Sequence, residues 1–121
     1  MDRFQELVVD AKKNIREVSA EESAALAKSG AAVLVDVREK EEWKQERVSG
    51  TVHLSRGTIE VEIEEKIPDT SGMIICFCGG GSRSALVAES LQRMGYTNVR
   101  SLAGGFRAWK AAGLPTEKAG P

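Results

Sequence analysis

Two short, almost continuous apolar runs stand out in the pattern of hydrophobic and polar positions along this chain. Residues 31–37 read Ala-Ala-Val-Leu-Val-Asp-Val, and residues 73–77 read Met-Ile-Ile-Cys-Phe. Runs of this length that are rich in β-branched residues are typical of strands buried on both faces of a parallel sheet. We therefore predict that both segments are strands at the centre of a sheet.

Segments with helical periodicity and further short strands alternate around these two runs. Ser19 and Glu22 form a capping box that opens a helix, and Gly30 ends it. Residues 58–67 are predicted to be helical, although the apolar residues between 59 and 63 also alternate as in a strand. The other helices are expected over residues 2–13, 38–43, 83–94 and 105–113, and the other strands over residues 15–18, 52–54 and 98–102.

The alternation of strands and helices predicts the fold class. It is typical of an α/β domain with a single, mainly parallel sheet of about five strands and helices on both faces. In such sheets ligands bind beyond the carboxyl ends of the strands. Cys78 lies just beyond one predicted strand, and residues 36–39 lie at the end of another.

Composition narrows the class of protein. The chain has 121 residues, of which 41% are hydrophobic, so we expect one domain with one core. The net charge is −1 and no basic stripe alternates with aromatic residues, which excludes nucleic acid as an expected partner. No segment is predicted to span a membrane, and the N-terminus does not resemble a signal peptide. We expect a cytoplasmic protein with reduced thiols.

Cys78 is the strongest candidate for chemistry. It opens the stretch Cys-Gly-Gly-Gly-Ser-Arg-Ser, which leads from a buried strand into a helix. Amides at a helix N-terminus are unpaired and carry partial positive charge, so they stabilise a thiolate, the reactive form of cysteine. Three glycines allow positive φ angles and a nest of inward-pointing amides. With Arg83 as an added cation, we predict a lowered pKa for Cys78 beside an oxyanion site.

The second cysteine and the single histidine have less specific interpretations. Cys76 and Cys78 would be about 6.5–7 Å apart at their Cα atoms, the upper limit for a disulfide, so Cys76 is interpreted as a core residue. Zinc would need further ligands, and no metal is predicted. A Cys–His pair with His53 stays open, but a half-buried histidine on a short strand is the preferred interpretation.

Several separated motifs resemble those of single-domain rhodaneses, which are sulfurtransferases. The resemblance covers roughly residues 18–117, most of the chain. Its motifs are Val33-Leu34-Val35-Asp36-Val37-Arg38-Glu39 with Glu42-Trp43, then Ser49-Gly50-Thr51-Val52-His53-Leu54, the loop from Cys78 to Ser84, and the C-terminal signature with Gly95-Tyr96, Asn98-Val99 and Gly104-Gly105-Phe106 before Trp109.

The resemblance implies covalent sulfur transfer without a cofactor. The Cys78 thiolate would attack the outer sulfur of a small anionic donor, such as thiosulfate, a persulfide or a polysulfide, and would keep that sulfur as a persulfide. Cyanide or a thiol, including a thiol of a partner protein, would then accept it. Arg83 would orient the donor, while Asp36 and Arg38 would support the neighbouring strand ends as an ion pair. The implied substrate-binding residues are Gly79, Gly80, Gly81, Ser82, Arg83 and Ser84.

The chain departs from the family pattern at several positions. Arg47 and Thr51 replace the usual histidine and alanine of the second motif. Gly79 and Gly80 replace larger or charged residues, which predicts an emptier and less cationic rim around the thiol.

Two other functions stay open. Phosphatases and arsenate reductases on this fold use Cys-x5-Arg, whereas four residues separate Cys78 from Arg83 here, and the shorter loop resembles that of sulfur-transferring members. A sulfur carrier or binding module with slow turnover is the other alternative.

The expected domain organisation is simple. A rhodanese-like domain is predicted at residues 15–117, preceded by a helical segment in residues 1–14 and followed by a tail in residues 118–121. The residues after Lys118 are expected to be frayed. The N-terminal helix lies before the region of resemblance, so it could pack on the domain or contact a partner.

Overall fold

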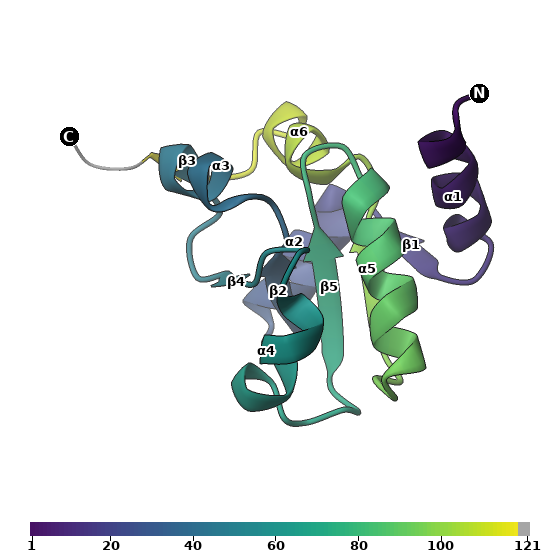
Figure 1. The fold of residues 1–121 in the computed structure, drawn as a ribbon. Coiled ribbons are helices and arrows are strands. Elements are labelled where there is room, and N and C mark those ends of the chain that lie inside the picture. Colours follow the sequence, from purple (N-terminus) through teal and green to yellow (C-terminus); the bar gives the residue numbers. More distant parts are fainter. Residues whose placement is uncertain (119–121) are drawn as a thin grey trace.

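Five parallel strands form the central sheet, in the order β1-β6-β5-β2-β4 (Figure 1). The computed structural model describes residues 1–118. The two apolar runs identified in the sequence form neighbouring strands in the middle of the sheet, with Asp36 opposite Phe77. The predicted α/β fold with a mainly parallel sheet of about five strands is confirmed. The strands are β1 (Arg16–Val18), β2 (Ala32–Asp36), β4 (Val52–His53), β5 (Met73–Phe77) and β6 (Val99–Leu102).

Helices cover both faces of the sheet, because parallel strands require crossover connections. On one face, Ile74 and Cys76 of β5 belong to a core built with α4 and α5. On the other face, Ile75 and Phe77 pack into a core with α2 and α6. The helices are α1 (Arg3–Lys12), α2 (Ala20–Lys28), α3 (Lys40–Gln45), α4 (Ile59–Lys66), α5 (Ser82–Arg93) and α6 (Gly105–Ala111).

Local sequence signals account for most of these elements. Ser19 caps α2 by accepting a hydrogen bond from the Glu22 amide at 3.0 Å, which is one half of the predicted capping box. The ambiguous segment at residues 58–67 is a helix, because Ile59 and Ile63 share one buried side that packs into the core. The prediction that residues 31–37 are buried on both faces is wrong at Val33, which is 40% exposed near the amino end of β2.

The N-terminal helix α1 packs on the domain beside α5 (Figure 1). Val8 and Ala11 on one side of α1 are buried. The side-chain amide of Asn14, just after the helix, donates a hydrogen bond to Glu89 of α5 at 2.9 Å. Of the two arrangements that the sequence left open for this helix, the structure therefore shows packing against the domain.

A second, two-stranded sheet was not predicted. The antiparallel strands β3 (Glu46–Arg47) and β7 (Glu117–Lys118) pair with each other. Their residues are charged and show no hydrophobic alternation, so no pattern marks them as strands. Polar contacts hold them together, including the salt bridge from Arg47 to Glu117 at 3.0 Å.

The predicted tail at residues 118–121 begins inside this second sheet, because Lys118 belongs to β7. The residues for which fraying was predicted, 119–121, lie outside the described part of the chain. None of the helices within residues 1–118 is long and apolar enough to cross a membrane.

Candidate active site

Cys78 lies immediately after β5, at the carboxyl edge of the sheet, and its side chain is enclosed by the loop that follows it. The Sγ atom accepts hydrogen bonds from the amides of Gly81 at 3.1 Å and Ser84 at 3.3 Å. The Ser84 hydroxyl lies 3.5 Å from Sγ and 2.8 Å from the hydroxyl of Ser101 on β6. When the thiol is ionised, Ser101 can donate to Ser84 while Ser84 donates to the sulfur. The loop therefore surrounds the sulfur with donors that favour its anionic form.

These donors determine the acidity of the thiol. Burial by itself raises the pKa of Cys78, but the hydroxyl and amide of Ser84 and the amides of Gly81 and Gly80 outweigh burial and lower the pKa below the ordinary value. Cys76, two residues earlier, shows the opposite balance. Complete burial, followed by repulsion from Cys78, raises the pKa of Cys76 to about 12. Of the two cysteines, Cys78 is therefore expected to have the larger thiolate fraction at neutral pH.

The three glycines of the loop act differently from the prediction. Only Gly81 has a positive φ, of +98°, and a Cβ there would lie 3.2 Å from the Gly104 amide nitrogen. Gly79 and Gly80 have no positive φ. Their lack of side chains instead leaves room for two guanidinium groups, because a Cβ on Gly79 would lie 3.2 Å from Arg83 and one on Gly80 would lie 3.1 Å from Arg107.

The start of α6 holds the outer side of the loop. The amides of Phe106 and Arg107 donate hydrogen bonds to the carbonyl oxygens of Cys78 at 2.7 Å and Gly79 at 3.1 Å. Gly105 makes this close approach feasible, since a Cβ there would lie 2.3 Å from the Cys78 carbonyl oxygen. The carbonyls of the loop thus bond to α6, while its amides face the sulfur.

Arg83 does not reach toward the thiol as an unpaired cation. Its guanidinium forms a two-pronged salt bridge with Glu42 of α3, at 2.8 and 3.1 Å. The hydrogen bond from Arg83 lowers the pKa of the Glu42 carboxyl, so the pair stays charged at neutral pH. Arg83, predicted as an added cation beside Cys78, is therefore paired with a carboxylate 41 residues away along the chain.

Arg107 was missed as a site residue by sequence reasoning. It lies on the exposed side of α6, and its guanidinium lies against the backbone of Gly80. The sequence places it in the C-terminal signature, 24 positions after Arg83, where nothing local connects it to the Cys78 loop. The docking of α6 on the Cys78 loop brings Arg107 next to Gly80.

Asp36 and Arg38 form the buried ion pair that the sequence predicted as a support. The Asp36 carboxylate is fully buried and accepts hydrogen bonds from the Arg38 guanidinium at 2.9–3.1 Å and from the Arg38 amide at 2.9 Å. The guanidinium also lies 4.1 Å above the ring of Phe106. The pair therefore links the end of β2 to the start of α6, close to the Cys78 loop.

His53 is not placed to act on Cys78. It lies on β4 at the edge of the sheet, two strands away from β5. Its Nε2 atom lies 2.9 Å from the Arg38 carbonyl oxygen, and its ring stacks on Trp43. This agrees with the interpretation as a half-buried structural histidine. Within residues 1–118, no cluster of His, Cys, Asp or Glu side chains is arranged to hold a metal ion.

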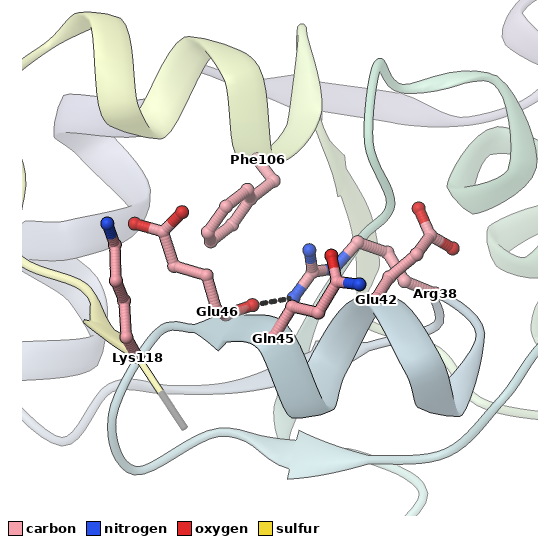
Figure 2. A pocket seen from close by; sticks show the side chains of 6 residues that line it. All are labelled: Arg38, Glu42, Gln45, Glu46, Phe106 and Lys118. Carbon is pink, nitrogen blue, oxygen red and sulfur yellow. Dashed lines mark hydrogen bonds between the residues drawn. The ribbon is translucent and has the colours of Figure 1, made fainter. Parts of the chain in front are cut away.

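A pocket of about 500 Å³ has no residue of the Cys78 loop in its lining (Figure 2). It shares Glu42 with the Arg83 salt bridge and Phe106 with the α6 contact to the loop. Its charged groups are largely paired: Arg38 bonds to Asp36 and to the Glu46 carbonyl oxygen at 2.7 Å, which is the dashed bond in Figure 2. The pocket is lined by Arg38, Glu42, Gln45, Glu46, Phe106 and Lys118.

The chain belongs to the family of rhodanese-like domains. The family model matches residues 19–112, which include both central strands and the whole Cys78 loop. A curated relative, the thiosulfate sulfurtransferase GlpE of Actinobacillus succinogenes, is 35% identical over 103 residues, covering 85% of this chain and 91% of the relative. The predicted resemblance to rhodaneses is thus confirmed.

Solved structures agree with this assignment. A protein of unknown function from Rhodopseudomonas palustris, described as a possible tyrosine phosphatase, superposes with a TM-score of 0.87 at 31% identity and covers 97% of this chain and 96% of its own. A polysulfide-sulfur transferase from Wolinella succinogenes gives a TM-score of 0.81 at 26% identity, covering 94% of this chain and 86% of its own. A thiosulfate sulfurtransferase from Pseudomonas aeruginosa gives 0.84 at 28% identity over 97% of this chain, which is 22% of that longer protein. The relatives support sulfur transfer as the general chemistry.

Proposed function

We propose that this protein is a sulfurtransferase that carries a sulfane sulfur on Cys78. The Cys78 thiolate attacks the outer sulfur of thiosulfate, the bond between the two sulfur atoms of the donor breaks, and sulfite leaves with the bonding electron pair. Cys78 then holds a persulfide. In the second stage a thiolate or cyanide attacks the outer sulfur of the persulfide, and the Cys78 thiolate is released. A persulfide or polysulfide donor can take the place of thiosulfate in the first stage.

The environment of the Cys78 sulfur is the observation that carries this proposal. The thiolate is the nucleophile of the first stage and the leaving group of the second, so donors that stabilise it assist both. The amides of Gly81 and Ser84 and the hydroxyl of Ser84 provide them. The lowered pKa of Cys78 increases the thiolate fraction near neutral pH, which reduces the need for a general base. We also propose a reducing compartment such as the cytoplasm, because the nucleophile has to stay a free thiol.

Intact mass spectrometry tests the first stage directly. After incubation with thiosulfate, the protein is expected to gain one sulfur atom, and the Cys78→Ser variant is expected to gain none. Cys76→Ser is the matched control, since this buried thiol lies two residues away and should leave the gain unchanged. No gain with thiosulfate, polysulfide or a persulfide donor would refute the proposal.

A sulfur carrier with slow turnover is the second candidate, and the burial of the nucleophile favours it. Cys78 is 1% exposed, so an acceptor has to reach deep into the loop to take the sulfur. A carrier would form the persulfide readily yet release little thiocyanate with cyanide, and it would pass sulfur faster to a partner protein thiol. Comparing the rate of persulfide formation with the rate of thiocyanate release distinguishes the two roles.

Phosphate-ester hydrolysis is a third candidate, because of the description of the R. palustris structure. The pairing of Arg83 with Glu42 argues against phosphatase activity, since this arginine is not free to bind a phosphate group. Hydrolysis of p-nitrophenyl phosphate at a rate comparable to sulfur transfer would make the phosphatase the better assignment.

A further inference from the structure

The arginines around the Cys78 loop differ in whether a carboxylate already pairs with their guanidinium group. Arg83, the only arginine within the loop, binds the Glu42 carboxylate with both terminal nitrogens. Arg38, at the end of the neighbouring strand, is buried against Asp36. Neither guanidinium is free to bind an incoming anion without losing a partner.

Arg107 is the exception. Among the residues that the structure describes, no salt bridge or side-chain hydrogen bond joins its guanidinium to another group. The side chain is exposed, and so is Gly80, against which it lies. A Cβ on Gly80 would be 3.1 Å from one terminal nitrogen of Arg107 and 3.4 Å from its Cζ atom.

Gly80 connects this guanidinium to the surroundings of the Cys78 sulfur. The Gly80 amide is one of the groups that stabilise the Cys78 thiolate. Because Gly80 has no side chain, nothing separates the Arg107 guanidinium from the backbone that lines the sulfur. The Arg107 amide is bonded to the Gly79 carbonyl oxygen at 3.1 Å, so the base of the side chain is fixed relative to the loop.

We propose that Arg107 is the residue that recognises the anionic sulfur donor. The inference rests on the proposed function, and it names the residue that binds the oxyanion part of the donor while the outer sulfur faces Cys78. A guanidinium presents planar, forked donors that match two oxygens of a sulfonate-type group. In the sequence, Gly80 predicted a rim with little positive charge around the thiol. In the structure, the absence of a side chain at Gly80 leaves room for the Arg107 guanidinium from α6.

The charge selectivity of Cys78 alkylation tests this binding role without requiring sulfur transfer. Iodoacetate and iodoacetamide have similar size and the same reaction with a thiolate, but only iodoacetate is an anion. In Arg107→Gln the rate with iodoacetate should fall about threefold to fivefold, as expected for one partly solvated charge pair, while the rate with iodoacetamide stays unchanged. Arg107→Lys should retain most of the iodoacetate rate, because it keeps the charge.

The matched control is Arg93→Gln, which removes the same charge at the far end of α5, roughly 17 Å along the helix from Ser82. It should leave the ratio of the two rates unchanged. Added salt should reduce the ratio in the native protein, because screening weakens attraction at an exposed site. An unchanged ratio in Arg107→Gln, or an equal fall with both reagents, would overturn the proposal.

Kinetics with thiosulfate then connect the charge to the donor. Arg107→Gln should raise KM for thiosulfate about threefold to fivefold with little change in kcat at saturation. If the native protein transfers no sulfur but still shows the Arg107-dependent preference for iodoacetate, the sulfurtransferase assignment fails and the anion site stands. If sulfur transfer proceeds with an unchanged KM in Arg107→Gln, the function stands and the role of Arg107 is refuted.

Discussion

At the scale of single residues, we predict that the reactivity of Cys78 depends on Ser84. Its amide and its hydroxyl both contact the sulfur, and the hydroxyl is held by Ser101. The hydroxyl contact can be removed without changing the backbone, because Ser84 lies within α5 and alanine is compatible with a helix.

Ser84→Ala should therefore raise the pKa of Cys78 by removing one of the groups that lower it. In the native protein, the alkylation rate with iodoacetamide should rise with pH to a half-point below about 8.5, the value of an ordinary thiol. The Ser84→Ala profile should move to higher pH. Near pH 7 its rate should fall about threefold to tenfold, for a hydrogen bond worth roughly 1 kcal/mol, and the two rates should converge at high pH.

Ser90→Ala is the matched control, since that hydroxyl bonds to Glu60 on another part of α5. A native half-point above about 8.5 would contradict the stabilisation of the thiolate. Equal profiles for Ser84→Ala and the native protein would show that the hydroxyl makes no contribution.

We predict that the Asp36–Arg38 pair contributes to stability rather than to chemistry. Asp36→Ala leaves the Arg38 guanidinium buried without its carboxylate, which should cost about 3–5 kcal/mol of the free energy of unfolding. Urea denaturation measures this loss. Glu117→Gln, which breaks the exposed pair with Arg47, should cost much less. A similar, small loss in both variants would contradict the structural importance of the buried pair.

At the scale of elements, the docking of α6 on the Cys78 loop decides the shape of the site. Two amides at the start of α6 bind the loop carbonyls, and this requires the backbones to approach more closely than a side chain at Gly105 would permit. The conformation of the Cys78 loop therefore depends on its contact with the start of α6, some 25 residues later in the chain.

Gly105→Ala should disrupt the loop and abolish most persulfide formation. Its Cβ would meet the Cys78 carbonyl oxygen at 2.3 Å, and neither backbone can move without breaking the hydrogen bonds of the loop. Gly95→Ala is the matched control, because Gly95 also has a positive φ, of +98°, but has open space around its Cβ position. The unfavourable φ alone should cost each variant roughly 1–2 kcal/mol of stability. The clash with the Cys78 carbonyl adds to this cost in Gly105→Ala, and only that variant should lose persulfide formation. Equal activity in the two variants would contradict this role for the α6 contact.

At the scale of the whole molecule, α1 is part of the folded unit. Val8 is 7% exposed in its contact with the domain, while Leu7 beside it is 59% exposed. Val8→Ala should lower the free energy of unfolding by about 1–2 kcal/mol, since two buried methyl groups are lost, and Leu7→Ala should have little effect. The measurement is a urea transition monitored by tryptophan fluorescence, because Trp43 and Trp109 lie outside α1. An unchanged transition in Val8→Ala would indicate that α1 unfolds independently.

The class of fold and the candidate nucleophile could be predicted because both have local causes. The apolar runs that form β2 and β5 can be recognised as strands from their composition. Because Cys78 directly follows β5, the architecture places it at the carboxyl edge of the sheet. The Asp36–Arg38 pair is likewise local, since its members are two residues apart. The sequence motifs were also sufficient to predict the family.

The charge around the thiol depended on contacts between distant segments. Glu42 neutralises Arg83 from α3, Arg107 reaches Gly80 from α6, and Ser101 supports Ser84 from β6. The small second sheet is similar, because its charged strands are stabilised by partners about 70 residues away rather than by their own pattern. By itself the sequence determined the fold class and the reactive sulfur, since periodicity and strand ends are properties of neighbouring residues. The tertiary structure alone decided which arginine near that sulfur is free, because electrostatic pairing depends on distance in space and not on separation along the chain.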